Sequence, residues 1–153
     1  MKASATLNLV VFRIGPHNLC VPISAVQEVL DSGRMVQLPR CPELLSGIVN
    51  LRGHVIAVVN LRRNFPDVPQ AVAGTHIIII NAAGGANIGL MVDLVRMVAP
   101  VAKSDFTQPE TAPGGANRAI ILASIVIAGE PAYLLDTGRI FSKEEFDLLK
   151  AVD

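Results

Sequence analysis

The apolar residues of this chain fall in runs of strand length, and glycine, proline or asparagine separates each run from the next. Breaks of this kind are typical of short strands joined by turns, and they leave little room for long helices. Even the uninterrupted run from Ile77 to Ile80 is far too short to cross a bilayer, so no direct membrane insertion is expected. The spacing therefore predicts an all-β fold.

Eight apolar runs carry the strand pattern, and one amphipathic segment closes the chain. The predicted strands cover residues 9–14, 19–23, 48–51, 55–61, 76–81, 88–92, 119–128 and 132–135. The closing segment is predicted to be a helix, because Ser142 can cap it and Glu145 follows at the spacing of a capping box. A long loop rich in proline, glycine and alanine is expected over residues 100–117.

The stretch AVQEVL is predicted to form one or two helical turns. Ser24 can cap these turns, and Val26, Val29 and Leu30 would share one face. For Val29 the core is the favoured position, whereas Val26 lies beside Glu28 in a turn that must partly face solvent. A further helical turn is expected at residues 43–45, within the loop PRCPELLSG.

The two halves of the chain repeat the same order of elements, and the matching residues can be aligned. Cys20 falls on Ile88, Val26 on Leu94, Val29 on Met97, Gly53 on Gly129, Asn60 on Asp136, Arg63 on Arg139 and Phe65 on Phe141. A repeat of about 70 residues is too short to bury much core alone. We therefore predict two five-stranded barrels packed together: residues 20–70 with the terminal elements, and residues 76–135. A groove is expected where the barrels meet.

Composition excludes several classes of function. Thirteen basic and thirteen acidic residues cancel, aromatic residues make up 4%, and there is no tryptophan, so nucleic acid is not an expected partner. The N-terminus does not resemble a signal peptide, so we expect a cytoplasmic protein. Cys20 is expected in the core and Cys41 in a loop, and their positions do not suggest a metal site.

Catalytic chemistry has little support in the sequence. His17, His54 and His76 form no metal-binding spacing, so neither a metal nor a cofactor is expected. The glycine-rich stretch AAGGANIG precedes a strand rather than a helix, which favours a hairpin turn over a phosphate loop. No nucleophile is brought to a base, and we expect that the protein is not an enzyme.

Arginines bracket the strand predicted over residues 55–61, with Arg52 before it and Arg62 and Arg63 after it. For Arg63 we favour a solvated residue that discourages edge-to-edge pairing. Arg52 differs because it precedes a glycine and lies near the apolar stretch PELLSGIV. An arginine in such a place is a strong interface anchor. With Val26 and Glu28 it predicts an apolar patch with a polar rim, suited to an amphipathic helix.

Four stretches carry a resemblance to the CheW family of bacterial chemotaxis coupling proteins: AVQEVL, GIVNLRGHVIAVVNLR, IGLMVDLVRMV and SKEEFDLLK. The resemblance runs from about Leu9 to Lys150, and treats the chain as a single CheW-like domain over residues 1–153. It implies two SH3-like barrels and an adaptor without catalytic activity. It implies binding to the cytoplasmic helical tip of chemoreceptors, to the regulatory domain of a CheA-type histidine kinase and to other copies in array rings. The protein would be recruited to membrane-associated receptor arrays.

The resemblance also assigns partner-binding residues. These are Val26, Glu28, Gly47, Arg52, Arg62, Gly89, Val95 and Val98, with the last two and Gly89 expected on the second barrel. Two departures affect the kinase side. Asn60 stands where the family usually has aspartate, so a charge expected near Arg62 is missing, and Thr137 and Gly138 replace bulkier residues.

Two other functions remain as alternatives. The chain could serve another chemosensory system, such as one controlling pilus-driven twitching motility. A more remote alternative is an enzyme that binds a small ligand in the cleft between the barrels. Such an enzyme needs convergent ionisable groups, which the sequence lacks.

Overall fold

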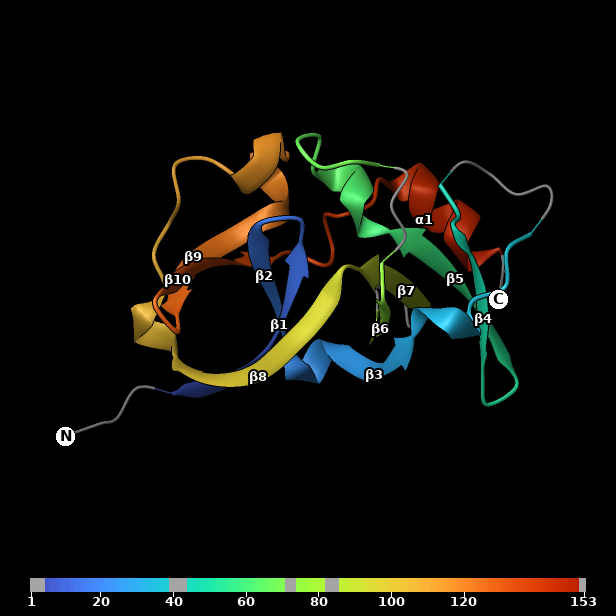
Figure 1. Ribbon diagram of the computed structural model, residues 1–153, viewed down its shortest axis with the longest axis horizontal. Helices are drawn as coiled ribbons and strands as arrows, with labels where there is room; N and C mark the ends of the chain where they lie inside the picture. Colours follow the sequence, from blue (N-terminus) through green and yellow to red (C-terminus); the bar gives the residue numbers. More distant parts are fainter. Residues whose placement is uncertain (1–4, 39–43, 71–73, 82–85, 152–153) are drawn as a thin grey trace.

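The computed structural model describes residues 5–38, 44–70, 74–81 and 86–151. Ten strands form two five-stranded sheets, and one α-helix closes the chain (Figure 1). The elements are β1 (Thr6–Ile14), β2 (His17–Pro22), β3 (Val26–Asp31), β4 (Gly47–Leu51), β5 (His54–Asn60), β6 (His76–Asn81), β7 (Asn87–Val92), β8 (Leu94–Ala102), β9 (Ile121–Ile127), β10 (Glu130–Leu135) and α1 (Lys143–Lys150).

Each sheet curls into a barrel around a central hairpin. The order β8-β1-β2-β10-β9 defines what we name the β1–β2 barrel, and the order β3-β6-β7-β5-β4 defines the β6–β7 barrel. In the β1–β2 barrel, Thr107, which follows β8, forms a bridge with Ser124 on β9. In the β6–β7 barrel, Val36, which follows β3, forms a bridge with Ile48 on β4. These bridges bring the two edges of each sheet together, as barrel closure requires. The predicted pair of five-stranded barrels is confirmed.

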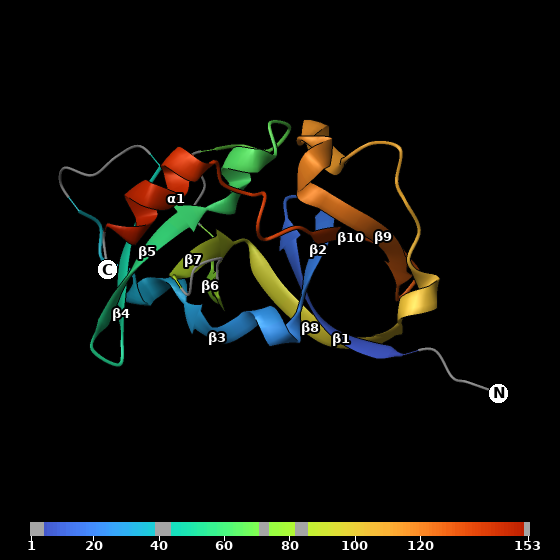
Figure 2. The same cartoon turned by 180° about the vertical axis from the view of Figure 1, so that it is seen from behind.

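Each barrel contains strands from both halves of the chain. The β1–β2 barrel takes its hairpin from the first half and β8, β9 and β10 from the second, and the β6–β7 barrel shows the reverse exchange. The two barrels lie side by side, with β9 and β4 near opposite ends of the molecule (Figures 1 and 2). The predicted ranges 20–70 and 76–135 therefore differ from the barrels, because β3 leaves the β1–β2 hairpin and pairs with β6.

The turns of two hairpins confirm the later part of the predicted alignment. Arg52 and Gly53 join β4 to β5 with φ of 53° and 84°, and Ala128 and Gly129 join β9 to β10 with φ of 52° and 80°. Two successive positive φ values are typical of the tight turns that suit the twist of paired strands. The match of Gly53 with Gly129 is thus a match of backbone conformation.

The earlier part of the predicted alignment was wrong by one residue. The same offset that matches Gly53 with Gly129 matches Val58 with Leu134. Val58 pairs with Gly89 and Leu134 pairs with Cys20, so Cys20 corresponds to Gly89 and not to Ile88. By the same register, Val26 corresponds to Val95 and Val29 to Val98. A slip of one residue moves a strand's side chains to the other face of its sheet, which is why the error matters for the site.

The described residues form three apolar cores, one inside each barrel and one shared between the barrels. Alternate residues of β6 point to different cores: Ile77 and Ile79 fill the β6–β7 barrel, while Ile78 and Ile80 face the core shared with the other barrel. A strand buried on both faces needs a continuous apolar run, which explains the four isoleucines. Cys20 lies in the separate core of the β1–β2 barrel, as predicted, and carries a free thiol.

The stretch AVQEVL is a strand rather than the predicted helical turns. Helical structure is limited to the 3-10 segment Ile23–Ala25, and no side chain caps it, so the predicted role of Ser24 was wrong. Pairing of β3 with β6 decides the conformation, because two valines suit a strand and β6 offers a free edge. Val29 is 38% exposed, which contradicts its predicted place in the core.

The C-terminal helix confirms its predicted capping box. The Ser142 hydroxyl accepts a hydrogen bond from the Glu145 amide, and the Glu145 carboxylate accepts one from the Ser142 amide. Leu149 is buried in the shared core, and Phe146 packs against it. The prediction for Cys41 and most of the one for AAGGAN lie outside the described residues. Of the helical turn expected at residues 43–45, the two described residues, Leu44 and Leu45, are not helical, so that prediction was wrong. Helix α1 is too short and too polar to cross a membrane, and no other described helix could do so.

Candidate functional site

Arg52 projects from the turn between β4 and β5. Its side chain is 81% exposed, and its nearest charge is Glu28 Oε1, which lies 3.8 Å from Arg52 Nη2. The turn is held by a hydrogen bond from the Gly53 amide to the Asn50 side chain. An exposed guanidinium on a tight turn keeps donors available for a partner.

Glu28 lies on β3 next to an irregularity in the pairing with β6. The register shifts between Val26 and Glu28, so Gln27 forms a bulge, and its side chain donates a hydrogen bond to Asn81. Bulges redirect neighbouring side chains. Glu28 Oε2 is buried and has no hydrogen-bond partner among the described residues. The carboxylate therefore retains acceptor capacity close to the arginine.

Valines at corresponding positions of β3 and β8 provide the apolar part of the candidate site. Val26 and Val95 are half-buried, and both pack against the core shared by the barrels. Val98 is 53% exposed and Val29 is 38% exposed. We define the contact surface as Val26, Glu28, Arg52, Val95 and Val98. These residues comprise three valines, at least partly exposed, and two opposite charges.

A polar network holds the bulge of β8 between Val95 and Met97. Arg96 Nη1 donates to the Asn18 side chain and to Glu130 Oε2, each at 2.9 Å. Asn18 also donates to Glu130 at 3.1 Å. The hydrogen bond from Arg96 lowers the pKa of the Glu130 carboxyl. Arg96 is thereby tied to β2 and β10 of its own barrel.

The two predicted site glycines are buried and have a structural role. A Cβ on Gly47 would lie 2.6 Å from the Val36 carbonyl oxygen, and one on Gly89 would lie 2.9 Å from an Ile77 methyl carbon. Both distances are too short for an ordinary contact. Gly89 also belongs to the β6–β7 barrel, whereas Val95 and Val98 belong to the β1–β2 barrel. The expectation that these three share a barrel was wrong.

Arg62 does not face solvent with the other predicted contact residues. Its side chain is 9% exposed, and its Nε and Nη2 atoms donate to the two oxygens of Asp93 at 2.8 and 2.7 Å. Its Nη1 atom donates to the Pro69 carbonyl at 2.6 Å. The guanidinium is occupied within the protein, so we leave Arg62 out of the contact surface.

Asp93 supplies the negative charge that the sequence departure left unaccounted for. Asn60, at the position where aspartate was expected, accepts a hydrogen bond from the Arg62 amide and caps the 3-10 segment Leu61–Asn64. Sequence reasoning missed Asp93 because its partner lies 31 residues away. The available signal was a lone carboxylate between two apolar strands.

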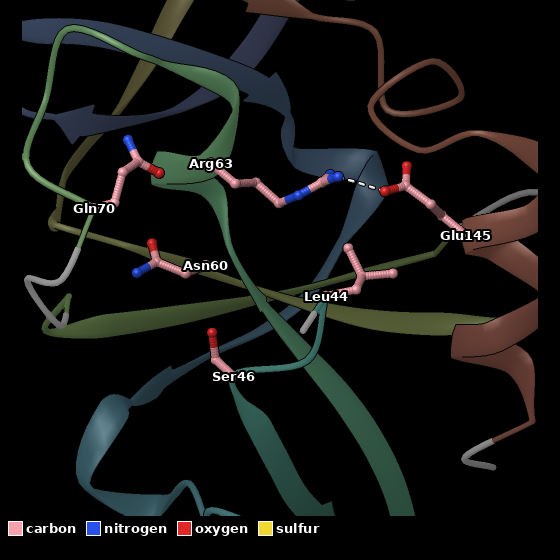
Figure 3. Close-up of a pocket in the computed structure, with 6 residues that line it drawn as sticks. All are labelled: Leu44, Ser46, Asn60, Arg63, Gln70 and Glu145. Carbon is pink, nitrogen blue, oxygen red and sulfur yellow. Dashed lines mark hydrogen bonds and ion pairs between the residues drawn. The ribbon is translucent and has the colours of Figure 1, made fainter. Parts of the chain in front are cut away.

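A cavity beside helix α1 lies away from the contact surface. It has a volume of about 590 Å³ and is lined by Leu44, Ser46, Asn60, Arg63, Gln70 and Glu145. Figure 3 shows Arg63 meeting Glu145 of α1 at this cavity. Arg63 also lies 6.0 Å from the centre of the Phe141 ring. Its role is to anchor the helix, rather than only to discourage edge pairing.

This cavity offers little for catalysis. Arg63 and Glu145 form an ion pair within it. Among the lining residues, Ser46 is the side chain that could act as a nucleophile, and the lining offers no general base to activate it apart from Glu145, which is paired with Arg63. Within the described ranges, no group of three or more His, Cys, Asp or Glu side chains is arranged to hold a metal ion.

Comparison with known proteins gives a consistent result. Residues 8–145 match the model of the CheW-like domain. The chain is 26% identical over 137 residues to the chemotaxis protein CheW of Rhizobium meliloti, covering 90% of this chain and 88% of that one. It is 29% identical over 98 residues to the protein FrzA of Myxococcus xanthus, covering 64% and 61% of the two chains.

A solved structure shares the fold. The scaffolding protein TtCheW from Thermoanaerobacter tengcongensis superposes with a TM-score of 0.77 at 24% identity, covering 90% of this chain and 89% of that one. The family match spans nearly all of both barrels and reaches into helix α1. The chain belongs to the CheW-like domain family.

Proposed function

We propose that this protein is a non-catalytic adaptor that couples chemoreceptors to a CheA-type histidine kinase, with the whole chain acting as a single CheW-like domain. The observation that carries the proposal is the family match over residues 8–145, together with the exposed Arg52 that matches the family motif. An adaptor needs partner surfaces on a rigid scaffold and no catalytic groups. The chain offers such a scaffold in its two barrels and their shared core.

The contact surface suits one helix of a receptor's cytoplasmic hairpin tip. Val26, Val95 and Val98 would contact an apolar stripe of the helix, and Arg52 would donate charge-assisted hydrogen bonds to an acidic residue beside it. Glu28, whose side chain is 35% exposed, would accept a hydrogen bond from the same helix.

The kinase's regulatory domain and further copies of the chain are the other proposed partners. The adaptor would be cytoplasmic and recruited to membrane-associated arrays by its receptor. Coupling would follow if receptor binding favours one arrangement of adaptor and kinase over another, since a ligand shifts an equilibrium only by its differential affinity.

Service in another chemosensory pathway is the second candidate. The similarity to FrzA of Myxococcus xanthus favours it, since FrzA carries a name other than CheW. The two candidates share the contact surface and differ in the receptor and kinase bound. Co-purification from the organism's own cells, followed by identification of the bound receptor and kinase, separates them.

The direct test of the contact surface is charge reversal at Arg52. The Arg52→Glu variant is expected to lose receptor binding in a pull-down with cytoplasmic receptor fragments, with an unchanged circular dichroism spectrum. Arg139→Glu is the matched control, because Arg139 is also exposed and also pairs with an acidic side chain, that of Asp136. Normal receptor binding by the Arg52 variant would show that the anchor is assigned to the wrong residue.

A further inference from the structure

The ion pair between Arg62 and Asp93 has a geometry that fixes direction as well as distance. Among the described residues, Arg62 is the one charged residue that is buried, with 7% of the whole residue exposed. Two parallel hydrogen bonds join its Nε and Nη2 atoms to the two Asp93 oxygens. Such a planar, bidentate pair holds both groups in one relative orientation, which a lysine cannot reproduce.

The position of Asp93 in the fold gives the pair its importance. Asp93 is the single residue between β7 of one barrel and β8 of the other. Its Oδ2 atom accepts a hydrogen bond from the Gly15 amide at 2.6 Å, and its own amide donates to the Arg13 carbonyl at 3.0 Å. Arg13 and Gly15 belong to the β1–β2 barrel and its hairpin turn.

Arg62 approaches the same point from the other barrel. It lies in the 3-10 segment Leu61–Asn64, which follows β5 directly. The carboxylate of Asp93 therefore receives hydrogen bonds from both barrels, through the Arg62 side chain on one side and the Gly15 amide on the other. The pair and its neighbours form a polar tie between the barrels at the point where the chain crosses.

The contact surface is divided between these same barrels. Val26, Glu28 and Arg52 belong to the β6–β7 barrel, whereas Val95 and Val98 belong to the β1–β2 barrel. Strand β8, which carries both valines, begins immediately after Asp93. Any change in the angle between the barrels alters the separation of the two halves of the surface.

We propose that the Arg62–Asp93 pair is a positioning element that fixes the angle between the barrels and thereby aligns the two halves of the contact surface. The inference rests on the proposed function for its binding consequence, but its geometric part does not. Neither residue is expected to touch the partner, because both side chains are largely buried, at 9% and 19% exposure.

Two lysine variants separate positioning from general stabilisation. Arg62→Lys keeps the positive charge and loses the bidentate geometry. Arg63→Lys is the matched control, because the neighbouring arginine is paired with Glu145 of α1 and does not contact the β1–β2 barrel in any described interaction. If Arg62→Lys does not fold, Asp93→Glu replaces it, since glutamate keeps both charges and lengthens the side chain by one methylene.

The angle is measured between two spin labels on opposite barrels. Val126→Cys on β9, where the valine is 70% exposed, and His54→Cys at the start of β5 give one label on each barrel. Cys41 is replaced by serine, and Cys20 stays because its side chain is fully buried. Pulsed electron spin resonance then reports the distance distribution, and calorimetry on unlabelled variants reports affinity for a cytoplasmic receptor fragment.

The expected result is a narrow distribution for the parent and for Arg63→Lys, and a broader or shifted one for Arg62→Lys, with affinity lowered about tenfold. An unchanged distribution in folded Arg62→Lys overturns the positioning role. A broadened distribution with unchanged affinity overturns the link to the contact surface. If the parent itself binds no receptor fragment, the proposed function fails, while the distance distributions still decide the geometric claim.

Discussion

Arg52 and Arg62 lie near opposite ends of β5 and have opposite environments. Arg52 is exposed on a tight turn, while Arg62 is buried against Asp93 and the Pro69 carbonyl. The sequence distinguishes Arg52 by the glycine that follows it, but nothing local distinguishes Arg62. Its environment depends on a carboxylate brought from the start of another strand, which is a tertiary contact.

The backbone at Arg52 predicts a conflict between stability and function. A φ of 53° is unfavourable for arginine and is well tolerated by asparagine. Arg52→Asn is expected to raise the free energy of unfolding by up to about 1 kcal/mol, because the exposed pair with Glu28 contributes little. Urea unfolding with a parallel receptor-binding assay checks both effects.

Ala128 provides the internal control for this prediction. It occupies the same turn position in the other barrel, with a φ of 52°, and lies outside the contact surface. Ala128→Asn should stabilise the protein to a similar degree without any effect on receptor binding. Loss of binding in both variants would mean that the turns, and not the Arg52 side chain, determine recognition.

Cys20 predicts a test of core integrity. Burial raises the pKa of its thiol to about 12, so the reactive thiolate is scarce at ordinary pH in the folded protein. In a Cys41→Ser background, alkylation at pH 8 should be slow without denaturant and fast in concentrated urea. Rapid alkylation of the native protein, measured by mass spectrometry, would contradict the closed core of the β1–β2 barrel.

At the scale of elements, the sequence predicts strands well and their register less well. Strand β6 was predicted with its bounds, since four isoleucines in a row suit a strand buried on both faces. In contrast, the sequence predicts helical turns where β3 lies, because AVQEVL fits both the helical and the strand period and only the pairing with β6 decides between them. Burial of Gly89 likewise could not be known before β7 was placed between β5 and β6.

The two serines predicted as caps give a paired test at this scale. Ser142 accepts a hydrogen bond from the Glu145 amide, whereas the 3-10 segment near Ser24 has no side-chain cap. Ser142→Ala is expected to lower the free energy of unfolding by about 1 kcal/mol. Ser24→Ala should leave it nearly unchanged, and equal losses in thermal unfolding would contradict the capping assignment.

At the scale of the whole molecule, duplication and exchange explain the architecture. The sequence predicts two barrels because the hairpin turns repeat. It does not show that the hairpin of each barrel shares a sheet with three strands from the other half of the chain. Side-chain periodicity identifies which face of a strand is apolar and is silent about which strand it will pair with. The shared core and the Arg62–Asp93 pair arise only after that exchange.

The central claim is that this chain bridges a receptor and a kinase, and that it binds the receptor through the contact surface. The most direct measurement is sedimentation of a CheA-type kinase with receptor-containing membranes from the same organism, with and without this protein. We predict that the kinase sediments in quantity when the protein is present, and that Arg52→Glu lowers the sedimented kinase about tenfold. Equal sedimentation of the kinase without the protein, or no effect of Arg52→Glu beside the Arg139→Glu control, would contradict the account.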